Sequence, residues 1–159
     1  MEEMKEGSET SLEARMESSL RKQLPLYDFF GLEVQSVRDG VYRCLVPHRK
    51  SNLNHINTIH AGIQWSAAEV LGGMVMISVL QGTPFFAVVK HVSIDFKRPA
   101  RTAITAEALF DEASAEKLKS DFETRGEASF ALQVSLRDLD GVEVSSAVGD
   151  YLARKPRAS

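Results

Sequence analysis

Residues 52–80, NLNHINTIHAGIQWSAAEVLGGMVMISVL, join a polar loop directly to a long and mostly apolar segment. Between positions 61 and 80 the only formally charged side chain is that of Glu69. Apolar residues fall on nearly every face of a helix drawn through 61–80, and this pattern predicts a helix that is buried on all sides. Because an unpaired buried carboxylate is costly, Glu69 must have either a partner or a function.

Composition and charge narrow the class of protein. Hydrophobic residues make up 43% of the 159 residues, enough for one domain with its own core. We expect that domain to span residues 11–159, after a disordered acidic tail at 1–10. The net charge of −3 creates no field that would attract nucleic acid or an anionic membrane. The single cysteine, Cys44, fits a reducing, cytoplasmic location, and the apolar run 70–80 is too short to span a membrane.

The region before the apolar segment begins with a helical pattern. Large apolar side chains recur four residues apart from Leu12 to Leu24, which predicts a helix over residues 11–23 that Pro25 ends. We interpret the next residues, PLYDFFG at 25–31, as a tight apolar connector.

Turn and capping signals define the remaining elements. Asp39-Gly40 separates two alternating runs and is the strongest short hairpin signal in the chain. After the long helix the pattern predicts strands over 85–99 and 102–112. It then predicts a short helix with Ser114 as its N-cap and Gly126 at its end, followed by a closing hairpin that turns at Asp140-Gly141.

A helix that is apolar on all faces needs cover on more than one side, and a curved antiparallel sheet can provide it. The sequence therefore predicts an α+β fold in which five to six strands wrap around one long central helix. An N-terminal helix and a short helix before the last hairpin complete it. An open sheet has edges, and the long strand at 86–96 is the candidate for pairing with a second copy of the chain.

The residues around the start of the long helix resemble those of hotdog-fold thioesterases of the PaaI-like group. Asn54, His60, Ala61, Gly62 and Glu69 match the asparagine, HGG and acidic-residue signature of that group, including its spacing. The match is closest to an uncharacterised hotdog subgroup of the DUF4442 type, which has HAG in place of HGG. The resemblance covers about residues 20–154 and implies a hotdog fold.

This resemblance implies hydrolysis of an acyl-CoA or another acyl thioester by a homodimer or homotetramer, with no cofactor beyond the coenzyme A of the substrate. Glu69 would be the nucleophile or the general base. A backbone N–H of Ala61 or Gly62, at the positive end of the helix, would polarise the thioester carbonyl. Asn54 and His60 would orient the thioester or the attacking water.

Helix geometry constrains how these residues could cooperate. Nine residues separate His60 from Glu69, so a helix places them about 13 Å apart along its axis and half a turn around it. One subunit cannot easily present both to one thioester, but two antiparallel copies of the helix across a dimer axis could. The sequence thus predicts two equivalent sites per dimer, which is also how the resembled family builds its sites.

Basic residues at the end of the long strand are candidates for substrate binding. Lys97, Arg98 and Arg101 cluster around a proline and could bind the phosphates of coenzyme A, with Lys90 earlier on the same strand. Neither CxxC nor HExxH is present, and the sequence therefore predicts no metal site.

Each assignment has a structural alternative. Glu69 could be a buried structural carboxylate that pairs with Lys90 or a histidine, and Asn54 and His60 could anchor the loop. The basic cluster could be an ordinary solvated strand end. At the level of function, the alternatives are a non-catalytic hotdog module that binds acyl-CoA or another apolar ligand, and a hydratase or dehydratase on the same fold. The sequence does not define the acyl group.

Overall fold

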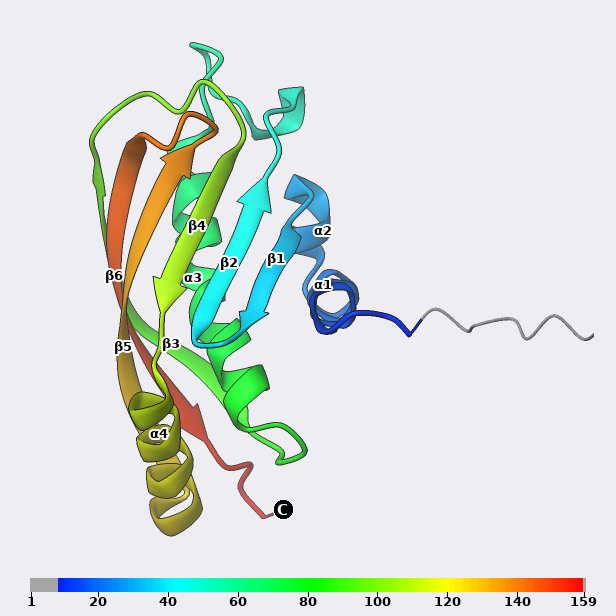
Figure 1. The fold of residues 1–159 in the computed structure, drawn as a ribbon, viewed down its shortest axis with the longest axis vertical. Coiled ribbons are helices and arrows are strands. Elements are labelled where there is room, and N and C mark those ends of the chain that lie inside the picture. The colour runs from blue at the N-terminus through cyan, green and yellow to red at the C-terminus, as the bar shows by residue number, and fades with distance from the viewer. Residues whose placement is uncertain (1–8, 159) are drawn as a thin grey trace, which may run out of the picture.

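The computed structural model describes residues 9–158, so the expected tail at 1–10 lies mostly outside the described residues. One long helix lies in the curve of a sheet, with the N-terminal helices beside the sheet (Figure 1). The helices are α1 (Leu12–Gln23), α2 (Pro25–Phe30), α3 (Ala61–Val79) and α4 (Glu112–Arg125), with a 3-10 turn at Lys50–Asn52. The strands are β1 (Glu33–Arg38), β2 (Val41–Val46), β3 (Phe86–Phe96), β4 (Ile104–Leu109), β5 (Glu127–Asp138) and β6 (Glu143–Arg154).

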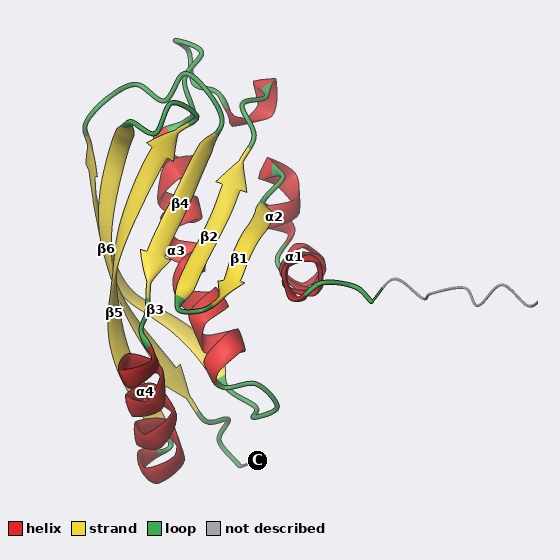
Figure 2. Cartoon of the chain, viewed as in Figure 1, coloured by secondary structure: helices red, strands yellow, loops and turns green. Residues whose placement is uncertain are grey.

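The six strands form one antiparallel sheet in the order β1-β2-β4-β5-β6-β3, and the sheet curves around α3 (Figure 2). This confirms the predicted α+β fold with a central helix. The hairpin between β1 and β2 turns at Asp39-Gly40, where both residues have positive φ, 55° and 73°. A two-residue turn of that kind matches the twist of the flanking strands.

Two local predictions were wrong by a few residues. The connector at 25–31 contains the helix α2, because Pro25 occupies its first turn and Gly31 ends it in the left-handed conformation with φ of 72°. The helix α4 begins before Ser114, since Asp111 is its N-cap and the Asp111 carboxylate accepts a hydrogen bond from the Ser114 N–H at 2.7 Å. Gly126 ends α4 as expected.

Gly72 explains how the helix α3 approaches the sheet so closely. A Cβ atom at this position would lie 2.2 Å from the ring of Tyr151, which projects from β6 and is 1% exposed. The neighbouring Gly73 differs, because a Cβ atom there would meet nothing within 4 Å. One glycine therefore admits an aromatic ring, whereas the other faces open space.

The helix α3 is not buried on all sides, contrary to the sequence prediction. Ala61 is exposed, Trp65 is 37% exposed and Glu69 is half-buried, so one stripe of the helix lacks cover. The reason is that the sheet curves around only part of the helix and ends at β3. Among residues 9–158 α3 alone is long and apolar enough to cross a membrane, but 56% of it is buried, as in a core helix.

The two edges of the sheet differ in their surroundings. The helix α1 lies beside β1, where Arg21 donates a hydrogen bond to the Leu32 carbonyl at 2.8 Å and Glu17 accepts one from the Val34 N–H at 2.8 Å. The edge strand β3 is at least partly exposed along its whole length. Its large exposed apolar residues are Phe86, Val88, Val89 and Phe96. An apolar edge of this kind is suited to pairing with another chain.

Candidate active site

The start of α3 is fixed by Asn52, which the sequence analysis did not single out. Asn52 is fully buried and donates hydrogen bonds to the carbonyls of Phe30 and Pro47, at 2.8 and 2.9 Å. Its own backbone carbonyl accepts the His60 N–H at 2.8 Å. Through its side chain and its backbone carbonyl, Asn52 thus joins the ends of α2 and β2 to His60, the residue before α3, and only the tertiary structure could reveal this.

Asn54 uses its side chain within its own loop. Its Oδ1 atom accepts hydrogen bonds from the N–H groups of Ile56 and Thr58, at 3.0 and 3.1 Å. Its Nδ2 atom donates to Thr58 Oγ1 at 2.8 Å. These bonds close the turn before α3, in which Asn57 has a positive φ of 61°. The geometry therefore supports the loop-anchoring alternative for Asn54.

His60 is the N-cap of α3. Its Nδ1 atom accepts a hydrogen bond from the Gly62 N–H at 2.9 Å, so this geometry requires Nδ1 to be unprotonated. Ser66 Oγ donates back to the Gly62 carbonyl at 2.8 Å. With the Gly62 N–H engaged, the first free donor of the helix is the Ala61 N–H, which has no hydrogen-bond partner among the described residues and lies at an exposed position.

Within residues 9–158 the partner of Glu69 is neither Lys90 nor a histidine but a tyrosine. Tyr27 Oη, from α2, donates a hydrogen bond to Glu69 Oε2 at 2.6 Å. Tyr27 is 6% exposed, and its ring packs edge-on against Phe30 with centroids 5.7 Å apart. The sequence analysis missed Tyr27 because it lies in the segment interpreted as a connector, 42 residues before Glu69.

Burial governs the protonation of this pair. Burial raises the pKa of Glu69 above its ordinary value, and the hydrogen bond from Tyr27 offsets part of that rise. Burial and the nearby Glu69 carboxylate also raise the pKa of Tyr27, so the phenol keeps its proton and remains the donor. A carboxylate with a raised pKa is a better base near neutral pH than an exposed one.

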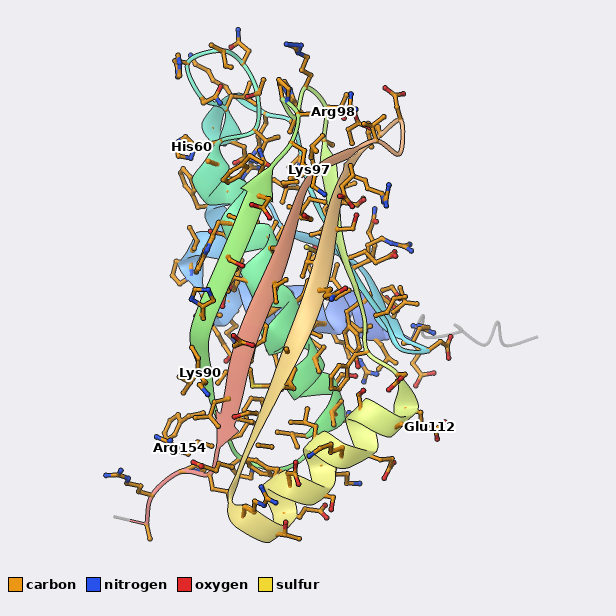
Figure 3. All side chains as sticks on the ribbon, turned by 90° about the vertical axis from the view of Figure 1, so that its left-hand side faces the viewer. His60, Lys90, Lys97, Arg98, Glu112 and Arg154 are labelled. Atoms are coloured by element: carbon orange, nitrogen blue, oxygen red, sulfur yellow. The ribbon has the colours of Figure 1, made fainter. Side chains whose placement is uncertain are left out.

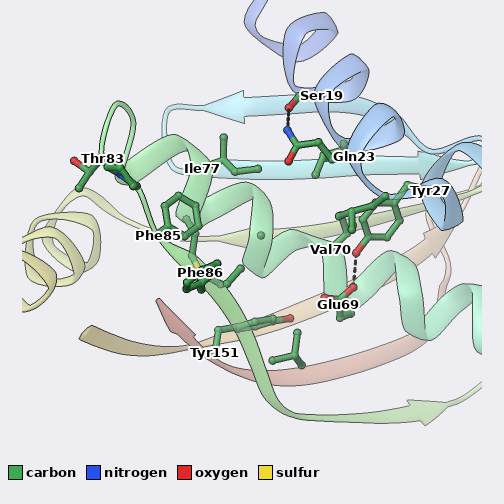
Figure 4. A pocket seen from close by; sticks show the side chains of 17 residues that line it. Ser19, Gln23, Tyr27, Glu69, Val70, Ile77, Thr83, Phe85, Phe86 and Tyr151 are labelled. Carbon is green, nitrogen blue, oxygen red and sulfur yellow. Dashed lines mark hydrogen bonds between the residues drawn. The ribbon is translucent and has the colours of Figure 1, made fainter. Parts of the chain in front are cut away.

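The Glu69 carboxylate lies at the wall of a cavity of about 740 Å³ between α1, α2, α3 and the start of β3 (Figure 4). Glu69 is the only formally charged residue among those that line it. Most of the others are apolar, including Leu20, Leu24, Val70, Met76, Ile77, Phe85, Phe86 and Val89. This volume and lining are typical of a site for a small apolar ligand.

The Ala61 N–H and Glu69 cannot act on one atom within a single protomer. Eight residues of helix separate them, about 12 Å along the axis. A reacting carbonyl needs the N–H donor within about 3 Å of its oxygen and the carboxylate within about 3 Å of the carbonyl carbon or of the attacking water, and both distances together are shorter than this separation. The two halves of the expected site therefore lie apart on the uncovered stripe of α3.

The basic residues do not form one cluster (Figure 3). Lys97 and Arg98 lie at the same end of the molecule as His60, whereas Lys90 lies toward the other end of β3. Seven residues of extended chain separate Lys90 from Lys97, about 23 Å. Lys90 is at a bulge in β3 and borders a hollow with Ser129 and Asp150. Lys97 forms an ion pair with Glu143, while Arg98 and Arg101 are exposed.

Solved structures similar to this chain share its architecture. One is a Pseudomonas aeruginosa protein of unknown function and probable thioesterase, 26% identical with a TM-score of 0.77, covering 92% of this chain and 99% of that one. Another, of unknown function from Chlorobaculum tepidum, is 21% identical with a TM-score of 0.80, covering 89% and 93%. A thioesterase from Haemophilus influenzae is 13% identical with a TM-score of 0.71, covering 92% and 93%.

No curated protein matches the chain. The family described as domain of unknown function DUF4442 matches residues 14–150, which is most of the sequence. Together with the sheet that curves around one central helix, this confirms the hotdog fold that the signature at 54–69 implied. The chain belongs to the DUF4442 family and has the hotdog fold.

Proposed function

We propose that the protein hydrolyses acyl thioesters, with acyl-CoA as the substrate class, and that Glu69 is the catalytic carboxylate. The observation that carries this proposal is the half-buried Glu69 on α3, which has a raised pKa, receives a hydrogen bond from Tyr27 and opens into an apolar cavity. The thioesterase descriptions of similar structures support the same reaction class.

The reaction needs a base and a donor for the oxyanion. Glu69 takes a proton from water, and the resulting hydroxide adds to the thioester carbonyl carbon. The Ala61 N–H, at the positive end of α3, donates a hydrogen bond to the oxyanion. Collapse of the tetrahedral intermediate breaks the carbon–sulfur bond, and the thiolate leaves with the proton held by Glu69. The products are a carboxylic acid and a thiol. Direct attack by Glu69, through an anhydride, gives the same products.

Tyr27 acts as a positioning residue for Glu69. Its hydroxyl holds Oε2, whereas Oε1 has no hydrogen-bond partner within residues 9–158 and is the atom available to the water. Because both Tyr27 and Phe30 are buried, the donor itself is held in place by packing.

A second copy of the chain completes each site. Because about 12 Å of helix separate Ala61 from Glu69, the partner's helix has to supply one of the two. The apolar edge of β3, next to the uncovered stripe of α3, is the surface on which the second copy pairs. Lys97 and Arg98 lie at the same end of the molecule as His60, and Arg101 is exposed three residues farther along the chain. All three are proposed to contact the coenzyme A phosphates.

The first test is the Glu69→Gln variant in a free-thiol release assay over a panel of acyl-CoAs. We expect kcat to fall by about 10²–10⁴-fold, the usual contribution of a general base. Glu127→Gln, which changes an exposed carboxylate on β5, is the matched control. Unchanged hydrolysis by Glu69→Gln would exclude the proposed mechanism. Absence of CoA release by the wild type, with binding retained, would favour a non-catalytic binding module.

Sharing of the site is tested by subunit complementation. Ala61→Pro removes the N–H at the first helical position, where proline fits a helix, and His60 already has the extended backbone that precedes proline, with φ of −59° and ψ of 141°. Neither Ala61→Pro nor Glu69→Gln should be active alone. After mixed refolding, half of the dimers are mixed and each has one intact site, so about a quarter of the wild-type activity should return. No recovery would place each site within one protomer.

A further inference from the structure

We infer that the cavity beside Glu69 binds an aliphatic acyl chain of medium length, and that Gly73 keeps the path for this acyl chain open. The inference rests on the proposed function and adds to it the chemical class of the acyl group.

The shape of the cavity follows the helix α3. Its lining residues on α3 are Glu69, Val70, Gly73, Met76 and Ile77, which are spaced as one stripe along the helix. From Glu69 to Ile77 this stripe extends eight residues, or about 12 Å. The cavity is therefore longer than the depth of one aromatic ring, and it runs parallel to the helix axis away from the carboxylate.

The walls of the cavity are suited to an aliphatic chain. Leu20 of α1 and Leu24, its C-cap, line the cavity together with Phe85, Phe86 and Val89. The polar side chains Ser19 and Gln23 are joined to each other by a hydrogen bond of 2.8 Å. Thr83 and Tyr151 are the other polar residues of the lining besides Glu69 and Tyr27, and the Tyr151 hydroxyl lies 3.5 Å from the Ala68 carbonyl. The remaining lining residues are apolar or glycine. An apolar chain would gain from leaving water here.

Gly73 marks the middle of this path. It lies one helical turn beyond Glu69 and lines the cavity, and a Cβ atom there would meet no other atom within 4 Å. Packing against α3 therefore does not require glycine at this position, in contrast to Gly72. Because glycine has no side chain, it leaves the cavity open between Glu69 and Ile77. An acyl chain of roughly eight to ten carbons, at about 1.25 Å per methylene, would fill the 12 Å between these two residues.

The test measures binding of S-alkyl coenzyme A thioethers, which cannot be hydrolysed, by isothermal titration calorimetry. We expect affinity to rise up to about fourfold per methylene, the usual gain for burying one, and to level off near ten carbons. S-ethyl, S-hexyl, S-decyl and S-hexadecyl compounds sample this range. Affinity that does not depend on chain length, or that keeps rising to sixteen carbons, would overturn the inference.

Variants at Gly73 test whether the alkyl chain of the ligand lies in this cavity. Gly73→Leu should weaken S-decyl binding at least tenfold relative to wild type, and Gly73→Ala should have a smaller effect in the same direction. Ala113→Leu, which adds the same side chain at an exposed position of α4, is the control. If Gly73→Leu binds the S-decyl compound as tightly as wild type, the alkyl chain of the ligand does not occupy this cavity. Should that variant fail to fold, binding to Gly73→Ala and the length profile of the wild type still test whether the alkyl chain lies in the cavity.

Failure of this inference can be told apart from failure of the proposed function. Thioether binding does not depend on catalysis, so the length profile should persist in Glu69→Gln. A chain-length optimum without hydrolysis would support the cavity and reject the enzyme. Hydrolysis that depends on Glu69 but shows no dependence on chain length would support the enzyme and reject the cavity as the site of the acyl chain.

Discussion

Replacing each of the adjacent glycines of α3 by alanine should change stability in opposite directions. At Gly72 the new Cβ atom would lie 2.2 Å from Cε1 and 2.3 Å from Cδ1 of Tyr151. The ring cannot easily retreat, because it stacks on Phe130 with centroids 5.3 Å apart and lies against the Ala68 carbonyl. Overpacking of this kind costs about 3 kcal/mol at the upper end of its usual range.

Helix propensity adds the same favourable contribution at both sites. Alanine is about 1 kcal/mol better than glycine inside a helix, so Gly72→Ala should destabilise the fold by about 2 kcal/mol net. Gly73→Ala meets no neighbour and should stabilise it by up to about 1 kcal/mol. For a chain of this size the melting temperatures should shift by roughly −4 to −8 °C and +2 to +4 °C, respectively.

Urea unfolding measures the difference directly, provided that both variants keep the wild-type slope with denaturant. The expected gap between the two variants is about 3 kcal/mol in the free energy of unfolding. Equal effects at the two positions would refute the distinction between a glycine that admits Tyr151 and a glycine that faces the cavity.

Two further predictions concern the loop and the carboxylate. In the proposed mechanism Glu69 acts in its ionised form, so hydrolysis should fall as the pH decreases through its raised pKa. Tyr27→Phe removes the hydrogen bond that lowers this pKa, so the acidic limb of kcat/KM should move to higher pH. An acidic limb that stays in place would count against Tyr27 as the positioning residue. Asn54→Ala removes three hydrogen bonds within the loop and should lower the free energy of unfolding by about 2 kcal/mol, measured in urea. Unchanged stability together with lost hydrolysis would instead indicate that Asn54 contacts the substrate.

Features that depend on residues close to one another in the sequence could be predicted from the sequence alone. The Asp39-Gly40 turn, the N-terminal helix and the start of α3 at Ala61 all follow from local conformational preferences. The same is true of the long apolar helix, because its composition alone requires a sheet or other helices around it. The resemblance of Asn54, His60 and Glu69 to the signature of the PaaI-like group implied the hotdog fold, which the structure confirms.

Only the tertiary structure determined which faces of these elements meet. It placed Tyr27 on Glu69 across 42 residues of sequence, and no local pattern could pair a phenol in an apolar segment with a carboxylate in a later helix. It also left one stripe of α3 uncovered and gave two adjacent glycines opposite surroundings. Helical periodicity defines the spacing of side chains around an axis, but what lies against each face depends on how the sheet curves, and that is a property of the whole chain.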